Sequence, residues 1–199
     1  MGNEIINTTR KVAVTAVMSA LSAVLMFIQI AIPLMPNFIK LDVSDLPELI
    51  TSFAYGPLWG VLVCLIKNLI HMAVTQSAGI GELSNFILGT VFVLVAGTFY
   101  KIHRNRKFAI IGSIAGSLAM AGMAFVVNLF LIYPLYMKFM MPKEVILGMY
   151  RDILPTVDSL WKAVLIFNVP FTFVKGFISV IITFIVYPKL SPVLKGCKK

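Results

Sequence analysis

Long apolar segments separated by short polar ones dominate this chain. Stretches without Asp, Glu, Lys or Arg run over residues 12–39, 83–100 and 108–137. Two further apolar stretches, 49–81 and 163–188, are each interrupted by a single lysine, Lys67 and Lys175. Because a membrane-spanning helix needs about 20 apolar residues, these lengths predict a series of membrane spans.

The stretch 49–81 is too long for one helix, and its Gly56-Pro57 pair favours a turn, so it predicts a helical hairpin. We therefore predict an all-α, polytopic membrane protein in which residues 1–199 form a single domain. The six predicted transmembrane helices are 11–32, 46–55, 57–77, 82–101, 108–137 and 160–187.

Composition supports a membrane protein. Hydrophobic residues make up 59% of the chain and charged residues 13%, and the mean hydropathy is +0.95. A soluble core of this length does not need so much apolar surface. The net charge of +9 does not indicate nucleic-acid binding, because no basic helix or aromatic RNA-binding signature stands apart from the helix ends.

With six membrane-spanning helices, most basic residues fall on one side of the membrane and most acidic residues on the other. One side receives both termini and the turns near 55 and 105, and its basic residues are Arg10, Lys11, Lys101, Arg104, Arg106, Lys107, Lys189, Lys195, Lys198 and Lys199, against the single acid Glu4. The acids of the other side are Asp42, Asp45, Glu48, Glu82, Glu144, Asp152 and Asp158, and its basic residues are only Lys40, Lys138, Lys143, Arg151 and Lys162. Cytoplasmic loops collect Lys and Arg, so both termini are predicted to be cytoplasmic.

Small residues line one face of the first predicted helix. Ala13, Ala16, Ala20 and Ala23 fall within an arc of about 80° at 3.6 residues per turn. Such stripes let helix backbones approach closely, either in a partner protein or within the same chain. Helix 108–137 carries a comparable set in its first half, so the alanine stripe alone does not decide between the two alternatives.

The segment 33–45 is expected to enter the membrane. It contains Pro33 and Pro36, which cannot continue a helix, yet it is too apolar for a freely solvated loop. The next helix, 46–55, spans only about 15 Å, half the hydrocarbon thickness, and draws this loop inward. Irregular backbone at that depth lines a cavity or is buried by protein, which predicts an outward-facing pocket roofed by residues 33–45.

The two intramembrane lysines indicate where polar chemistry is concentrated. A central lysine costs about 2.5–3.5 kcal/mol on insertion, so it faces the bundle interior or a polar cavity. Lys175 shares a face with Thr172 and Asn168, and Asn85 and Asn128 are predicted to converge on it. Lys67 forms a second polar cluster with Asn68 and His71. The alternative for both lysines is a structural role, in which they cap carbonyls or bond buried asparagines.

Motifs for catalysis are absent from the sequence. There is no G-x-S-x-G, Walker A or H-E-x-x-H pattern, and Cys64 and Cys197 show no metal or disulfide spacing. The acids are expected on the outer rim, and His71 has no evident nucleophile beside it. We predict no catalytic residue, no metal site and no cofactor.

Several blocks of sequence together resemble the riboflavin-specific substrate-binding (S) component of energy-coupling factor (ECF) transporters. They are Ile32-Pro33, the L-D-x-S-D-x-P loop from Leu41 to Pro47, Gly56-Pro57, Lys67-Asn68, the run from Gly81 to Phe86, Asn128, the run from Pro134 to Tyr136, Pro170-Phe171 and Lys175-Gly176. The order of these blocks is specific to the group, whereas any one block is weak.

The resemblance implies a riboflavin-binding subunit in the cell membrane. Its six helices would enclose the vitamin near the outer surface, and the alanine face would contact a transmembrane coupling subunit driven by two cytosolic ATPases. Riboflavin is uncharged, so the pocket needs apolar faces and fixed hydrogen-bonding groups rather than an ion pair. The residues expected to bind it are Asn37, Phe38, Leu41, Asp42, Glu82, Asn85, Asn128, Thr172 and Lys175.

Position 172 departs from the family pattern. Two other functions also remain possible alternatives. Similar proteins often read P-F-N-x-x-K, whereas Thr172 stands here in place of the asparagine, which leaves the preference between riboflavin and a phosphorylated flavin undecided. An S component for a different vitamin is the main alternative. An intramembrane enzyme using Asp42, His71 or Lys175 is the other.

Overall fold

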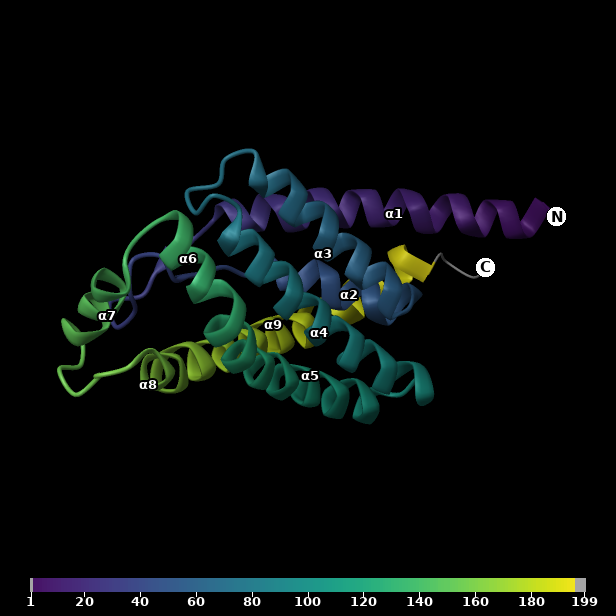
Figure 1. Cartoon of the computed structure of the whole chain (residues 1–199). Helices are drawn as coiled ribbons and strands as arrows, with labels where there is room; N and C mark the ends of the chain where they lie inside the picture. The colour runs from purple at the N-terminus through teal and green to yellow at the C-terminus, as the bar shows by residue number, and fades with distance from the viewer. Residues whose placement is uncertain (1, 196–199) are drawn as a thin grey trace.

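The computed structural model describes residues 2–195, with side chains described from 8 to 187, and it is largely helical (Figure 1). The elements in chain order are α1 (Gly2–Phe27), β1 (Ile30–Ala31), β2 (Lys40–Leu41), α2 (Asp45–Tyr55), α3 (Pro57–Met72), α4 (Ile80–Ile102), α5 (Arg106–Val127), η1 (Asn128–Ile132), α6 (Tyr133–Phe139), α7 (Lys143–Arg151), α8 (Leu160–Ala163), η2 (Val164–Asn168) and α9 (Val169–Lys195). The predictions for the side chains of Glu4, Lys189, Lys195, Cys197, Lys198 and Lys199 fall outside the described side chains.

Four helical segments of the described chain are long and apolar enough to cross a membrane. They are Thr8–Phe27, Ile80–Ile102, Arg106–Phe139 and Leu160–Tyr187. The predicted hairpin forms shorter helices, α2 with 11 residues and α3 with 16. The all-α, polytopic class is confirmed, and the count of six spans stays a prediction.

The turn between α2 and α3 forms where the sequence predicts it. Gly56 has a φ of 108°, a conformation that residues with a side chain rarely adopt, and Pro57 begins α3 at a position where its missing N–H costs nothing. A Cβ built at Gly60 would lie 2.9 Å from the carbonyl oxygen of Glu48. The two helices therefore pack backbone against backbone.

The first predicted helix ends earlier than expected. It was predicted to reach residue 32, but α1 ends at Phe27, and β1 then pairs antiparallel with β2, with Ile30 opposite Leu41. The two prolines lie in the loop between these strands. Extended pairing thus satisfies backbone groups that a helix interrupted by proline would leave open.

The third predicted helix also ends early, at Met72 rather than 77. The hydroxyl oxygen of Thr75 accepts hydrogen bonds from the backbone N–H groups of Ser77 (3.2 Å) and Gly79 (3.1 Å). This local bonding offers the backbone a turn in place of another helical turn.

Helix α7 lies in a segment that the sequence analysis treated as an outer loop. Its Ile146, Leu147 and Tyr150 are buried in an apolar cluster with residues of α6 and η2. The spacing of these three positions matches one face of a helix and is a signal that the sequence analysis missed.

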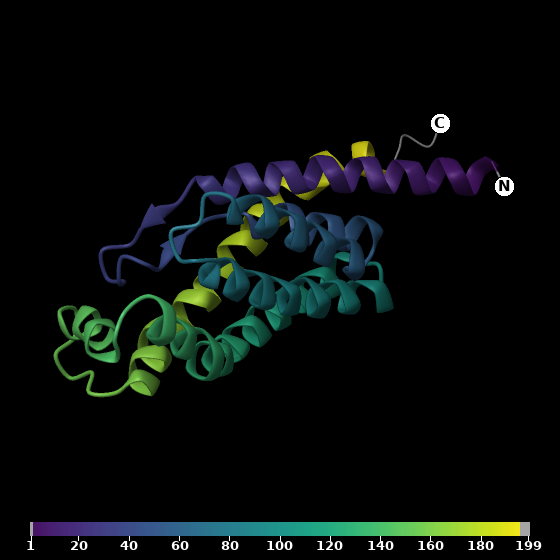
Figure 2. The same ribbon diagram turned by 45° about the horizontal axis from the view of Figure 1, so that its top comes forward.

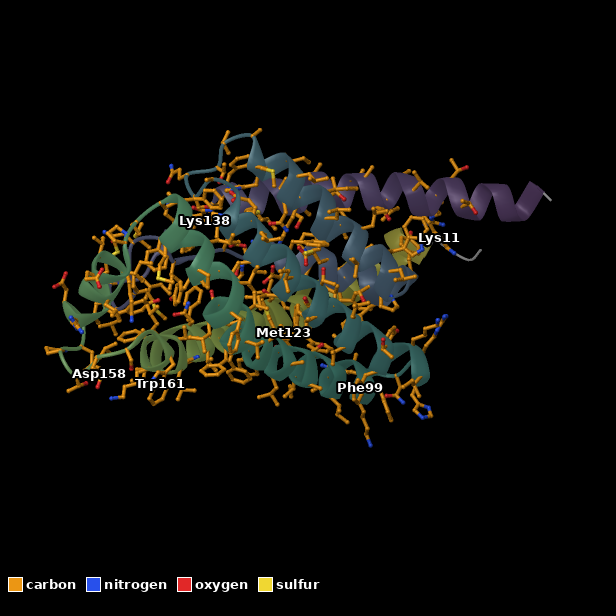
Figure 3. The ribbon with its side chains drawn as sticks, in the orientation of Figure 1. Lys11, Phe99, Met123, Lys138, Asp158 and Trp161 are labelled. Atoms are coloured by element: carbon orange, nitrogen blue, oxygen red, sulfur yellow. The ribbon has the colours of Figure 1, made fainter. Side chains whose placement is uncertain are left out.

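The turns and helix ends separate into two groups at opposite ends of the bundle (Figures 1 and 2). The beginning of α1, the end of α9 and the α2–α3 and α4–α5 turns lie at one end. The β1–β2 loop, α7 and the segment leading to α8 lie at the other. Figure 3 labels Lys11 and Asp158 at these two ends. The basic α4–α5 turn and the start of α1 therefore share one end of the molecule.

Candidate functional site

A cavity of about 770 Å³ lies among the elements that meet at the α7 end of the bundle. Ligand pockets in proteins are typically of about 300–1,000 Å³. Its wall includes all the predicted binding residues except Leu41, namely Asn37, Phe38, Asp42, Glu82, Asn85, Asn128, Thr172 and Lys175. Leu41 lies in β2, outside the lining. Their role in binding stays a prediction.

The β1–β2 loop forms one side of this cavity, where a roof from residues 33–45 is predicted. The stretch 37–40 and Asp42 line the cavity. The Phe38 ring contacts Tyr136 at 5.6 Å between centroids and Tyr150 at 6.3 Å. An aromatic wall therefore attaches the loop to α6 and α7.

Lys175 lines the cavity and is 7% exposed. Its Nζ donates to Asp42 Oδ2 at 3.0 Å and to Asn85 Oδ1 at 3.3 Å, which confirms that Asn85 converges on this lysine. Asp45 Oδ2 lies 3.6 Å away. These ion pairs lie within the protein, because a buried ammonium needs a carboxylate to offset its lost hydration.

Asp42 is held in its ionised form. Its Oδ1 accepts hydrogen bonds from the backbone N–H of Ser44 at 2.9 Å and from the Ser44 hydroxyl at 2.5 Å. Burial acts to raise the pKa of this carboxyl, but Lys175, Lys67 and the Ser44 bonds outweigh burial and lower the pKa to about 2. The Ser44 bonds therefore hold the Asp42 carboxylate in position for the Lys175 ammonium.

Lys67 is fully buried and belongs to the same group of charges. Its Nζ lies 2.9 Å from Asp45 Oδ1 and 2.5 Å from Glu48 Oε1, and it donates to Ser44 Oγ at 2.7 Å. We call Asp42, Asp45, Glu48, Lys67 and Lys175 the buried charge cluster.

The buried charge cluster corrects the predicted position of three acids. Asp42, Asp45 and Glu48 were placed on the outer rim, but they are at most 6% exposed. They are buried because two intramembrane lysines require carboxylate partners. The structural alternative considered for the lysines named only carbonyls and asparagines, and Lys175 does bond Asn85 in addition to Asp42. Acids three residues apart in an otherwise apolar helix, at Asp45 and Glu48, were the available signal.

Glu82 reaches the cavity with its carboxylate already engaged. Its oxygens contact His71 Nδ1 at 2.8 Å and accept from Thr75 Oγ1 at 2.8 Å and Ser77 Oγ at 3.2 Å. His71 lines the cavity as well and contacts Gln29 at 3.4 Å. Glu82 thus connects α3, the following turn and α4 at the rim of the cavity.

Amide side chains from the two π-helical segments and tyrosines from α6 complete the wall. Asn128 begins η1 and Asn168 ends η2, and both line the cavity, as do Tyr133 and Tyr136. The two tyrosines and Asn168 were not among the predicted binding residues. Asn168 was identified only as a neighbour of Lys175 along its helix face, while the tyrosines gave no periodic polar signal.

The alanine face of α1 is mostly open. Ala13, Ala16 and Ala20 are exposed, whereas Ala23 is 3% exposed and belongs to the core. The comparable set in α5 behaves differently, since a Cβ at Gly112 would meet Phe99 Cβ at 2.6 Å and one at Gly116 would meet the Phe92 carbonyl oxygen at 2.8 Å. The α5 stripe serves packing within the chain, whereas the α1 stripe is exposed at three of its four alanines.

Comparison with known proteins gives a consistent result over nearly the whole chain. Residues 10–187 match the family model described as ECF transporter, substrate-specific component. The chain is 30% identical to the riboflavin transporter RibU of Staphylococcus aureus (strain TCH60) over 186 residues, covering 94% of this chain and 93% of that protein. It is 29% identical to the riboflavin transporter FmnP of Bacillus subtilis (strain 168), covering 92% and 93%.

A solved structure shares the fold. It is the S component of a bacterial ECF transporter, with a TM-score of 0.75 and 30% sequence identity. The match covers 95% of this chain and 99% of that one.

Proposed function

The chain belongs to the substrate-specific components of ECF transporters, and we propose that it is the subunit that binds riboflavin for uptake. As a member of this family it is a transport component and not an enzyme. Riboflavin is the transported ligand, so no cofactor enters the proposal. The whole chain acts as one substrate-binding domain.

The observation that carries the proposal is the cavity with its uncharged amides and aromatic wall. Riboflavin combines a flat tricyclic ring, polar at one edge, with a polyhydroxyl chain. Phe38 and Tyr136 offer apolar faces for the ring, while Asn128, Thr172 and Lys175 offer hydrogen-bonding groups. The similarity to two proteins named riboflavin transporters supports this choice of vitamin.

Capture takes place from outside the cell membrane. The end of the bundle opposite the cavity carries Lys11 in α1 and the basic α4–α5 turn with Arg104 and Arg106. Because basic loops stay in the cytoplasm, that end and both termini are cytoplasmic. The cavity is then accessible from the outer face, where dilute vitamin has to be captured.

Release to the inside needs partners. The sequence has no nucleotide-binding motif of its own. The resemblance to ECF S components implies that energy comes from two cytosolic ATPases acting through a transmembrane coupling subunit. The exposed Ala13, Ala16 and Ala20 form the contact face for that subunit, since small residues permit close helix approach in a bilayer.

Copurification tests the proposal. Protein purified in mild detergent from cells grown with riboflavin should be yellow, with the visible absorbance of a flavin that is released on denaturation. Colourless protein that instead releases thiamine or biotin would assign the chain to a different vitamin. Mass spectrometry of the released ligand distinguishes riboflavin from a phosphorylated flavin.

A further inference from the structure

Two π-helical segments interrupt the long helices beside the cavity. In η1 the N–H of Tyr133 bonds the carbonyl of Asn128, and in η2 the N–H of Val169 bonds the carbonyl of Val164. Single π turns inside α-helices frequently occur at functional sites. Each segment contributes one asparagine to the cavity wall, Asn128 from η1 and Asn168 from η2.

The amide of Asn168 is oriented by two tyrosines. Its Oδ1 accepts from Tyr150 Oη at 2.7 Å and lies 3.1 Å from Tyr133 Oη, and the two hydroxyls also contact each other. The protons of both hydroxyls are therefore used within this group, which we call the amide–tyrosine triad (Tyr133, Tyr150 and Asn168). Both tyrosines are at most 1% exposed, so the arrangement is rigidly packed.

Fixing the oxygen also fixes the other end of the amide. With Oδ1 directed at the tyrosines, the Nδ2 of Asn168 is the end left to donate, and no hydrogen bond from it occurs among the described side chains. Asn128 has the opposite arrangement, because its Nδ2 donates to the carbonyl of Ala124 at 2.8 Å and leaves Oδ1 to accept. One cavity thus holds a free amide donor and a free amide acceptor.

A donor and an acceptor in the wall of one cavity match an imide edge, in which an N–H is flanked by carbonyl groups. The pyrimidine part of the flavin ring has such an edge. On the basis of the proposed function, we propose that Asn168 is a specificity-determining residue that donates to an imide carbonyl of riboflavin. Tyr133 and Tyr150 are positioning residues that hold its amide in the donating orientation.

The test compares Asn168→Leu with a matched control, Asn68→Leu. Asn68 is also a buried asparagine, but it bonds the carbonyl of Cys64 at 2.8 Å and lies outside the cavity lining. Losing the donor leaves a buried ligand acceptor unpaired, so Asn168→Leu should weaken riboflavin binding roughly 5- to 150-fold. Asn68→Leu should leave the affinity of the folded protein unchanged.

Vibrational spectra of bound riboflavin separate a direct contact from a structural effect. A carbonyl that loses its hydrogen-bond donor stretches at a higher frequency, so the imide carbonyl band should move upward in Asn168→Leu and stay in place in Asn68→Leu. Tyr150→Phe should move the carbonyl band in the same direction with a smaller loss of affinity, since Tyr133 still donates to Asn168 Oδ1.

An unchanged affinity and carbonyl band in Asn168→Leu would overturn the inference. If that variant does not fold, wild-type affinity and spectrum in Tyr150→Phe would overturn it instead. Failure of the wild-type protein to bind riboflavin would reject the proposed function as well, so the two failures are distinguishable.

Discussion

Lys175 illustrates how one residue acts both in the fold and at the site. It lines the cavity, yet its ammonium is already bonded to Asp42 and Asn85. A ligand that approaches Lys175 therefore meets a lysine held in position, not a mobile charge. Any substitution there changes both the cavity wall and the balance of the buried charge cluster.

Lys175→Met is expected to lower stability as well as affinity. Removing one member of a buried ion pair leaves the partner carboxylate of Asp42 uncompensated, which costs about 3–5 kcal/mol. Ligand-free melting should fall, and riboflavin should bind more weakly. The double variant Lys175→Met with Asp42→Asn removes both charges and should recover part of the melting temperature. A single variant that melts like the wild type would contradict this.

Lys67→Met provides a contrast at a site away from the cavity. Lys67 pairs with Asp45 and Glu48 but is not part of the lining. We expect a comparable loss of stability, about 3–5 kcal/mol, with no change in riboflavin affinity for the fraction that folds. Melting curves and dissociation constants measured on the same preparation check both points. A selective loss of affinity would show that the cluster transmits changes to the cavity.

The sequence identified most of the cavity's polar residues but not their partners. Intramembrane polar residues such as Asn128 and Lys175 stand out in an apolar helix. Placing each of them in the membrane costs free energy, so a polar residue at such a position is expected to have a function. The acids that neutralise the lysines were assigned to the outer rim, since counting charges on each side does not reveal how deeply a residue lies. Tyr133 and Tyr150 have an apolar body that resembles ordinary core.

At the level of elements, the two small-residue stripes show how similar patterns acquire different roles. The α5 stripe packs against α4, where an added Cβ at Gly112 or Gly116 would clash with backbone or side chain. The α1 stripe leaves Ala13, Ala16 and Ala20 exposed. The spacing of small residues in the sequence is similar in the two stripes. Only the packing in the structure shows that the α5 stripe is buried and the α1 stripe is exposed.

Replacing Ala16 and Ala20 by leucine should abolish ATP-driven uptake and spare riboflavin binding by the solitary protein. The added side chains prevent close approach of a partner helix without touching the cavity. Gly112→Leu serves as the control, because its side chain would collide with Phe99 and should lower stability first. If the alanine variants lose binding as severely as uptake, the stripe serves intramolecular packing.

Helix positions were predictable because membrane helices must be long, apolar and hydrogen-bonded internally. The Gly56-Pro57 turn was predictable from local backbone chemistry. The positions of the helix ends were less predictable than the helices themselves. The β1–β2 pairing and the Thr75 hydrogen bonds end two helices, and the helical repeat of 3.6 residues in the hydrophobic pattern carries no information about such contacts. Helix α7 was missed because its short apolar face lies in a polar segment.

At the scale of the whole molecule, the bundle has two chemically distinct ends. The turn of α4 and α5 is basic, and the opposite end holds the cavity and Asp158. In the proposed orientation, this polarity presents the cavity to the side from which the vitamin arrives.

Cysteine labelling tests the orientation. Cysteines introduced at Asn105 and Asp158, in a background with Cys64 and Cys197 replaced by serine, should react with an impermeant reagent from opposite sides of the membrane. Asp158 should be labelled in intact cells, and Asn105 only after permeabilisation. Labelling of both positions from one side would require a different topology.

The most direct test of the whole account is the affinity of the purified, ligand-free protein for riboflavin. Quenching of flavin fluorescence on titration should give a dissociation constant on the order of nanomolar, equivalent to about −12 kcal/mol, for one riboflavin per chain. Thiamine and biotin should not compete. Absence of flavin binding by protein that remains folded, or tight binding of one of those competitors instead, would contradict the assignment of this cavity to riboflavin.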